Sequence, residues 1–301
     1  MARTEVHEPP PAPSPPARLT ERLAALAMPC PVHPSAHLVE AATSDWARAA
    51  GLAPDPVASR LAGRAFARCE TGAVTSLARW LTWMSHLRRA PEALTPVLAV
   101  AEGGAPGPAP LERAFSGLWT ACAPGMSGAW RERFTAGLAA QREASLTRGT
   151  PPADTYGTPP ADDRGKPAGG AFGRYLFDLV EPCLGVEVPE QVWRSQSWRA
   201  LVEASGDVAA RCEEAVAGHG QVDTIFLERS NQAAEEWTID RVATRVEELW
   251  TAARAIPALT ERHDLGLTLS LEVTRVACAF LTIPRAYLEW LLETPRYRHL
   301  R

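Results

Sequence analysis

Apolar side chains recur with the period of an α-helix along almost the whole chain, and this pattern restricts the fold more than any other feature. In residues 74–90 the spacing of three and four predicts one buried helix face, made by Leu77, Trp80, Leu81, Met84 and Leu87. The same periodicity predicts helices over residues 38–52, 55–69, 111–123, 129–147, 172–184, 191–217, 239–256 and 267–294. No alternating apolar and polar run bounded by hairpin turn residues occurs, so we expect an all-α fold.

Two stretches rich in proline or glycine divide the chain. Residues 1–18 contain six prolines and almost no apolar side chains, so we predict a disordered tail over residues 1–27. The alternative for this tail is a docking segment for a partner protein. Residues 149–170 contain five prolines and five glycines and are predicted to form a flexible loop. Residues 28–301 are then predicted to form a single α-helical domain.

The charge balance and the cysteines exclude several classes of protein. The 31 basic and 35 acidic residues leave a net charge of −4, too small to hold the chain on nucleic acid by bulk charge. No uncharged apolar stretch has the roughly 18 residues that a membrane span needs, and the polar start lacks the pattern of a secretory signal. Six scattered cysteines without a C-x-x-C spacing predict neither a zinc site nor a disulfide framework. We therefore expect a cytoplasmic protein.

Five segments together carry a family resemblance. They are MPCPVHPSAHLVEAATSDWARAAGL at residues 28–52, ARWLTWMSHL at 78–87, FDLVEPCLGVEVPEQV at 177–192, TIDRVATRVEELWTAARAIPAL at 238–259 and YLEWLLETPRYR at 287–298. In order and spacing they resemble the bacterial class I terpene synthases. The resemblance implies a helical bundle around a central apolar pocket and an isoprenoid-like ligand. It also implies a chemistry in which three Mg²⁺ ions, held by carboxylates, remove diphosphate from a prenyl substrate whose carbocation then cyclises.

The metal-binding motifs of that family, D-D-x-x-D and N-D-x-x-S-x-x-x-E, are not retained here. The resemblance places the first on Arg88, Arg89 and Glu92, and the second on Glu213, Ala217 and Gln221. Two of these six positions keep a carboxylate, and a metal ion beside a guanidinium is repelled rather than attracted. We therefore predict no metal site and no cofactor. Magnesium-dependent cyclisation with unusual motifs is the alternative.

Arginines near the lost first motif offer a different kind of site. Arg88 and Arg89, with Arg296 and Tyr297 from the end of the chain, could bind an anion directly, because a guanidinium matches phosphate or carboxylate without a metal. The alternative is that the first two are solvated residues at a helix end, where a cation favours the helix dipole. The resemblance also calls for a diphosphate-sensing arginine, and three basic residues lie near its place, Arg164, Lys166 and Arg174.

Three carboxylates are candidate proton donors for a reaction without metal: Glu92, Glu213 and Asp163. For Asp163, in the proline-rich stretch, a solvated loop position is the alternative. His86 and His219 lie beside the two lost motifs and could relay a proton, or they are plain surface residues.

Aromatic residues could line the implied pocket. Trp80 precedes the lost first motif and Phe177 begins a segment that carries the resemblance. Aromatic faces stabilise carbocations through their quadrupole, so both are candidate pocket residues. At helical spacing such residues are more often core.

Three hypotheses about function follow. The first is a noncanonical member of the terpene synthase family that cyclises or otherwise transforms an isoprenoid or apolar polyene without the three-magnesium cluster. The second is a pseudoenzyme that binds an apolar ligand or a partner protein, motivated by the reversal of charge at the first motif. The third is magnesium-dependent terpene cyclisation with altered motifs.

Overall fold

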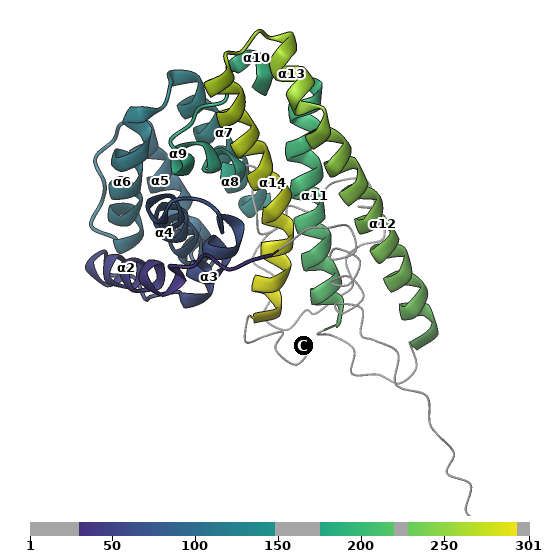
Figure 1. Cartoon of the computed structure of the whole chain (residues 1–301). Coiled ribbons are helices and arrows are strands. Elements are labelled where there is room, and N and C mark those ends of the chain that lie inside the picture. Colours follow the sequence, from purple (N-terminus) through teal and green to yellow (C-terminus); the bar gives the residue numbers. More distant parts are fainter. Residues whose placement is uncertain (1–29, 148–174, 220–227, 294–301) are drawn as a thin grey trace, which may run out of the picture.

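The structure, a computed structural model, describes residues 30–147, 175–219 and 228–293 (Figure 1). All the regular elements in these ranges are helices, with no strand among them. The predicted all-α fold is therefore confirmed. The predicted tail and the predicted loop over residues 149–170 lie outside the described residues.

Three helices form the first part of the bundle. They are α2 (Ala36–Ala49), α3 (Pro56–Ala65) and α4 (Thr71–Leu87), and each packs against the other two. The start of α3 is fixed by Asp55, whose side chain accepts hydrogen bonds from the backbone N–H groups of Val57 and Ala58, both at 3.0 Å. Ser35 occupies the N-cap position before α2 but makes no capping hydrogen bond through its side chain.

The next elements cover one side of α4. A 3₁₀ turn, η1 (Pro91–Ala93), leads into α5 (Leu94–Ala101), followed by α6 (Pro110–Cys122), the turn η2 (Ala123–Gly125) and α7 (Gly128–Thr147). The prolines at the first positions of η1 and α6 suit a helix start, where the missing N–H is not needed. Here α6 packs against α4, and α5 packs against both α6 and α7.

The C-terminal part contains the long helices. After α8 (Tyr175–Asp178), α9 (Val180–Leu184) and α10 (Glu190–Trp193) come α11 (Gln196–His219), α12 (Glu228–Arg254), α13 (Ile256–Arg262) and α14 (Leu267–Glu293). In Figure 1, α14, α11 and α12 run side by side, and α11 packs against both of the others. Near the middle of α14, Phe280 contacts the rings of Phe177 and Trp198 edge to face, at 5.4 and 5.7 Å between centroids.

Helix α14 is the one helix in the described ranges that is long and apolar enough, by length and composition, to cross a membrane. It packs against α3, α11 and α13, and 13 of its 27 residues are buried. It also contains Pro284 and the charged residues Arg285 and Glu289. These contacts are those of a core helix in a bundle.

Among the differences from the predicted helices, two have a clear physical reason. The helix predicted over residues 172–184 is divided at Leu179, because Pro182 has no N–H to bond the carbonyl of Asp178. That carbonyl accepts a hydrogen bond from the indole of Trp130 instead, at 2.9 Å. Helix α5 was not predicted, because its sequence LTPVLAVA is apolar nearly throughout and shows no period.

Candidate functional site

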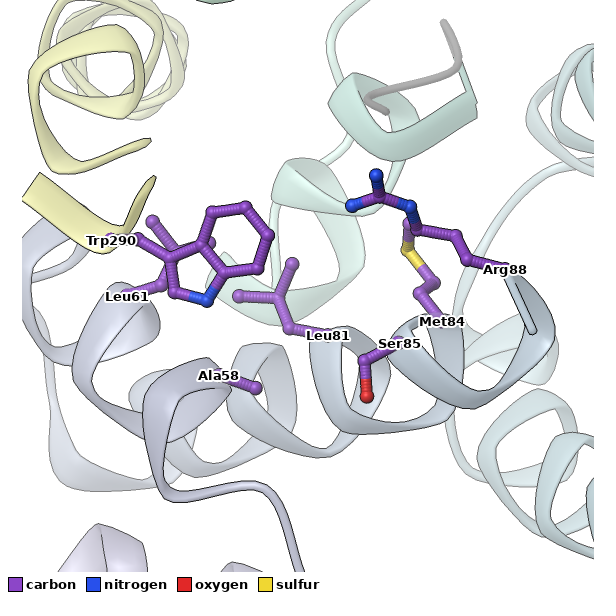
Figure 2. A pocket seen from close by; sticks show the side chains of 7 residues that line it. All are labelled: Ala58, Leu61, Leu81, Met84, Ser85, Arg88 and Trp290. Carbon is purple, nitrogen blue, oxygen red and sulfur yellow. The ribbon is translucent and has the colours of Figure 1, made fainter. Parts of the chain in front are cut away.

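A small hollow with a cavity volume of about 30 Å³, partly open to solvent, lies between α3, α4 and the C-terminal end of α14 (Figure 2). Seven residues line it: Ala58, Leu61, Leu81, Met84, Ser85, Arg88 and Trp290. Most of these side chains are apolar, and one is charged. The hollow therefore has the character of a small apolar binding site with a single cation.

Helix α4 supplies four of the lining residues from one face. Leu81, Met84, Ser85 and Arg88 follow the spacing i, i+3, i+4 and i+7, which places them in one stripe along the helix. The first two are buried, and the hydroxyl of Ser85 donates to the carbonyl of Thr82 at 2.9 Å. This bond leaves the oxygen of Ser85 as the polar atom on an otherwise apolar wall.

The opposite walls come from α3 and α14. Ala58 and Leu61, on α3, are buried, and the half-buried indole of Trp290 faces them from α14. The ring of Trp290 stacks on that of Tyr287, with 5.1 Å between centroids, and Tyr287 is itself buried in the core. This aromatic wall was not anticipated from the sequence.

The hollow has an asymmetric distribution of charge. Figure 2 shows Trp290 and Arg88 on opposite sides with Leu81 between them, and the guanidinium of Arg88 turned toward the space. Arg88 is exposed and follows the last residue of α4, where the helix end carries partial negative charge. An apolar molecule with an anionic end would therefore find its charge partner at the rim.

The other predicted residues at this end of α4 do not line the hollow. Arg89 is exposed, and Glu92 is exposed on η1. His86 bonds through Nε2 to the carbonyl of Ala53 at 2.9 Å, so it ties α4 to the segment before α3. Of the predicted anion and proton sites at this end, the structure thus brings only Arg88 to the hollow.

The two predicted pocket aromatics also lie elsewhere. Trp80 is fully buried and makes edge contacts with Trp83, Phe115 and Phe134, at 5.7 to 5.9 Å between centroids. Phe177 is buried against Phe280, as described above. Neither is among the residues that line the hollow, and both are packed as core in this part of the bundle.

Several predicted site residues fall outside what the structure describes. These are Asp163, Arg296, Tyr297, the side chains of Glu213 and His219, and the three candidates for a sensing arginine, Arg164, Lys166 and Arg174. Their parts in a site remain predictions.

The described residues at the end of α4 do not fit a magnesium ion. Mg²⁺ takes oxygen ligands, whereas Arg88 and Arg89, which the sequence resemblance assigns to the first two motif positions, carry guanidinium groups. Glu92 is the one remaining carboxylate of that motif and is exposed on a separate turn. Within the described ranges, no group of three or more His, Cys, Asp or Glu side chains is arranged to hold a metal ion.

A buried charge cluster lies on the other side of the bundle and joins α7 to α8 and α9. Arg133 donates to Asp178 at 2.6 Å and also to Glu181, and its guanidinium lies 4.8 Å from the centre of the Trp193 ring. Glu181 accepts a further bond from the N–H of Val188 at 2.8 Å. Burial raises the pKa of Glu181 to about 8, although Arg133 and the Val188 N–H pull it down.

The described helices form an α-helical bundle, and comparisons with known proteins relate it to the terpene synthases. A family model described as terpene synthase family 2, C-terminal metal binding, matches residues 77–215, from α4 into α11. A (−)-δ-cadinene synthase of Streptomyces clavuligerus is 25% identical over 250 residues, which are 75% of this chain and 76% of that protein. A (−)-β-caryophyllene synthase of Saccharothrix espanaensis is 26% identical over 65% of this chain and 59% of its own length.

Solved structures show the same fold. The linalool/nerolidol synthase of Streptomyces clavuligerus, in complex with 2-fluorogeranyl diphosphate, has a TM-score of 0.67 at 20% identity, over 90% of this chain and 99% of its own. Germacradien-4-ol synthase from Streptomyces citricolor has a TM-score of 0.68 at 18% identity, over 88% and 96%. In sequence and in fold, the chain is similar to the bacterial class I terpene synthases.

Proposed function

We propose that this protein binds an isoprenoid with an anionic head group in the hollow beside α4 and transforms it without the three-magnesium cluster. The observation that carries the proposal is Arg88, a cation at the rim of an apolar hollow; the sequence resemblance predicts this position to be that of the first aspartate of the family motif. Two of the similar proteins are described with a prenyl diphosphate. One relative is named as cyclising (2E,6E)-farnesyl diphosphate, and one solved structure holds 2-fluorogeranyl diphosphate.

The walls of the hollow suit the hydrocarbon part of such a molecule. Leu61, Leu81 and Met84 offer aliphatic surface, and the face of Trp290 offers a quadrupole that favours positive charge on a reacting carbon. The cavity volume is about 30 Å³, well below the roughly 300–1,000 Å³ typical of ligand sites, so binding of an isoprenoid here requires the walls of the hollow to move apart.

Arg88 is proposed to hold the anionic head. A guanidinium can donate two parallel N–H bonds to a phosphate or carboxylate, and its charge does not depend on pH in the physiological range. Arg296 and Tyr297, predicted to join this site, would add a second cation and a hydroxyl. Glu213 and Asp163 remain the proposed proton donors, since Glu92 does not line the hollow.

The test is binding of geranyl and farnesyl diphosphate by calorimetry, in EDTA and then with added Mg²⁺, followed by analysis of products. Arg88→Gln is expected to weaken metal-free binding about tenfold, which corresponds to about 1.4 kcal/mol. Arg89→Gln is the matched control, because this neighbouring arginine is exposed and does not line the hollow.

The products separate this function from its alternatives. Product formed in EDTA supports metal-free transformation. Tight binding without product favours the pseudoenzyme, an alternative that the reversed charge at Arg88 and Arg89 supports on its own. Product that requires Mg²⁺ supports magnesium-dependent cyclisation with unusual motifs, and equal effects of the two substitutions contradict the role of Arg88.

A further inference from the structure

One carboxylate and two arginines tie the end of α14 to α3. Glu293, the last residue of α14, accepts from Nε of Arg60 at 2.6 Å and from a terminal nitrogen of Arg64 at 2.5 Å. The two arginines are four residues apart, so they lie on one face of α3 and hold both oxygens of the carboxylate. These three residues are called the α3–α14 latch below.

The latch lies next to two walls of the hollow. Leu61, a wall residue, directly follows Arg60 on α3. Trp290, the wall residue of α14, precedes Glu293 by three positions and so lies less than one helical turn away on the same side of that helix. The ion pairs therefore join the two elements whose separation determines how far Trp290 stands from Leu61.

The electrostatic setting makes the latch stronger than an ordinary surface ion pair. The side chain of Glu293 is 11% exposed and that of Arg64 is 17% exposed, so water screens their attraction only in part. Burial by itself disfavours the ionised carboxylate, but the hydrogen bonds and charges of Arg64 and Arg60 outweigh it and lower the pKa of Glu293. The carboxylate is consequently ionised at neutral pH.

We propose that the α3–α14 latch sets the width of the hollow and thereby selects the chain length of the isoprenoid that it accepts. The inference rests on the proposed function, since it assigns positioning residues to the same hollow. With the latch closed, Trp290 is held against the α3 wall and longer chains are excluded. With the latch broken, the last turn of α14 can move outward and the hollow can admit more hydrocarbon.

A second ion pair on α14 provides a matched control. Glu289 accepts from Arg285 at 2.9 Å, and these side chains are 18% and 11% exposed, close to the values for the latch. Both residues of this pair lie on α14, but the charge of Glu289 also acts on Arg64 of α3, so Glu289→Gln is expected to weaken the attraction between the two helices less than Glu293→Gln does. Glu293→Gln and Glu289→Gln thus make the same chemical change on the same helix with different geometric consequences.

The experiment compares the two variants with the wild-type protein in two measurements. The first is hydrogen–deuterium exchange of the last turns of α14 without ligand, which Glu293→Gln is expected to raise about tenfold and Glu289→Gln to change by less than about twofold. The second is the ratio of the affinities for farnesyl and geranyl diphosphate, which Glu293→Gln is expected to shift about tenfold toward the longer chain. Arg64→Lys keeps the charge, and it is expected to give a smaller shift in the same direction.

The outcomes distinguish this inference from the function on which it rests. If both glutamine variants raise exchange equally, or if the affinity ratio stays at its wild-type value, the latch does not control the hollow. If Glu293→Gln fails to fold, Arg64→Lys decides between the same two results. If the wild-type protein binds neither diphosphate, the proposed function fails, while exchange in the variants still shows whether the latch fixes the end of α14.

Discussion

The two sides of α4 are built very differently. On one side, Trp83 is fully buried and its indole donates to the carbonyl of Leu111 at 3.0 Å, which ties α4 to α6. The rings of that side form a continuous cluster that reaches α7 and comprises Trp80, Trp83, Phe115, Trp119, Trp130 and Phe134. On the other side, Leu81 and Met84 border the hollow.

This difference separates the part of the fold that stabilises the bundle from the part that can accept a ligand. Residues advance about 100° per position around a helix, so Trp83 lies about 200° from Leu81, nearly opposite. On the aromatic side, large rings fill the space, and the indole N–H groups of Trp83 and Trp130 both donate hydrogen bonds to backbone carbonyls. The hollow side lacks comparable close packing, and its described cation, Arg88, lies where a ligand would enter.

Truncation of one side chain on each side of α4 should give the largest difference in the free energy of unfolding. Trp83→Ala removes a fully buried ring and its hydrogen bond, and it is expected to destabilise the protein by about 3–5 kcal/mol. Met84→Ala removes a side chain that already borders open space, so we expect a loss of about 2 kcal/mol, the lower end of its class. Urea unfolding of both variants measures the difference, and equal losses would show that the two sides are packed alike.

The charge cluster behind the aromatic side predicts a dependence of stability on pH. The pKa of Glu181 is raised to about 8 in the folded protein, from an ordinary value of 4.5, because the carboxyl is buried. A raised folded-state pKa means that its contribution is complete below pH 4.5 and is lost as the pH rises to about 8. The wild-type protein should therefore lose stability relative to Glu181→Gln across this interval, by at most about 1.4 kcal/mol per pH unit.

Thermal unfolding of the wild-type protein and Glu181→Gln at several pH values between 5 and about 8.5 measures this effect. Glu92→Gln is the control, because Glu92 is exposed and lies outside the cluster. One guanidinium, that of Arg133, faces two carboxyl groups, which is why a neutral Glu181 is reasonable here. A wild-type protein that instead gains stability over the variant as the pH rises would mean that its pairing with Arg133 outweighs burial.

The helical bundle could be predicted from the sequence because a buried helix face repeats its apolar residues every three or four positions. The prediction of residues 74–90 as a helix matches α4, and the break before Pro91 is present. The single apolar stripe predicted there was too simple, because α4 is buried on both sides and carries Trp83 outside that stripe. Periodicity in one helix shows which residues share a face, but not how many neighbouring helices cover it.

The candidate site was less accessible from the sequence. Trp80 was chosen for its nearness to the lost motif, whereas the hollow is lined by the stripe of Leu81, Met84 and Arg88. Their i, i+3 and i+7 spacing is visible in the sequence and could have indicated one face ending in an arginine. Trp290 and Glu293 had no local signal, since their roles depend on contacts of α14 with α3 that join residues more than 200 positions apart.

Substitutions that add side-chain volume on each side of α4 should give the smallest difference in stability and so test the comparison most finely. Ala58 borders the hollow and Ala114 lies beside Phe115 on α6, and both are buried helical alanines with 3% exposure. Ala114→Leu must displace close-packed neighbours and is expected to cost about 1–3 kcal/mol. Ala58→Leu can extend into the hollow, so its cost should be below about 1 kcal/mol, while prenyl diphosphate affinity falls as the space is lost. Ala58→Val, which adds less volume, is the control. If Ala58→Leu is as unstable as Ala114→Leu, the hollow cannot take up added volume, and the two sides of α4 do not differ in this way.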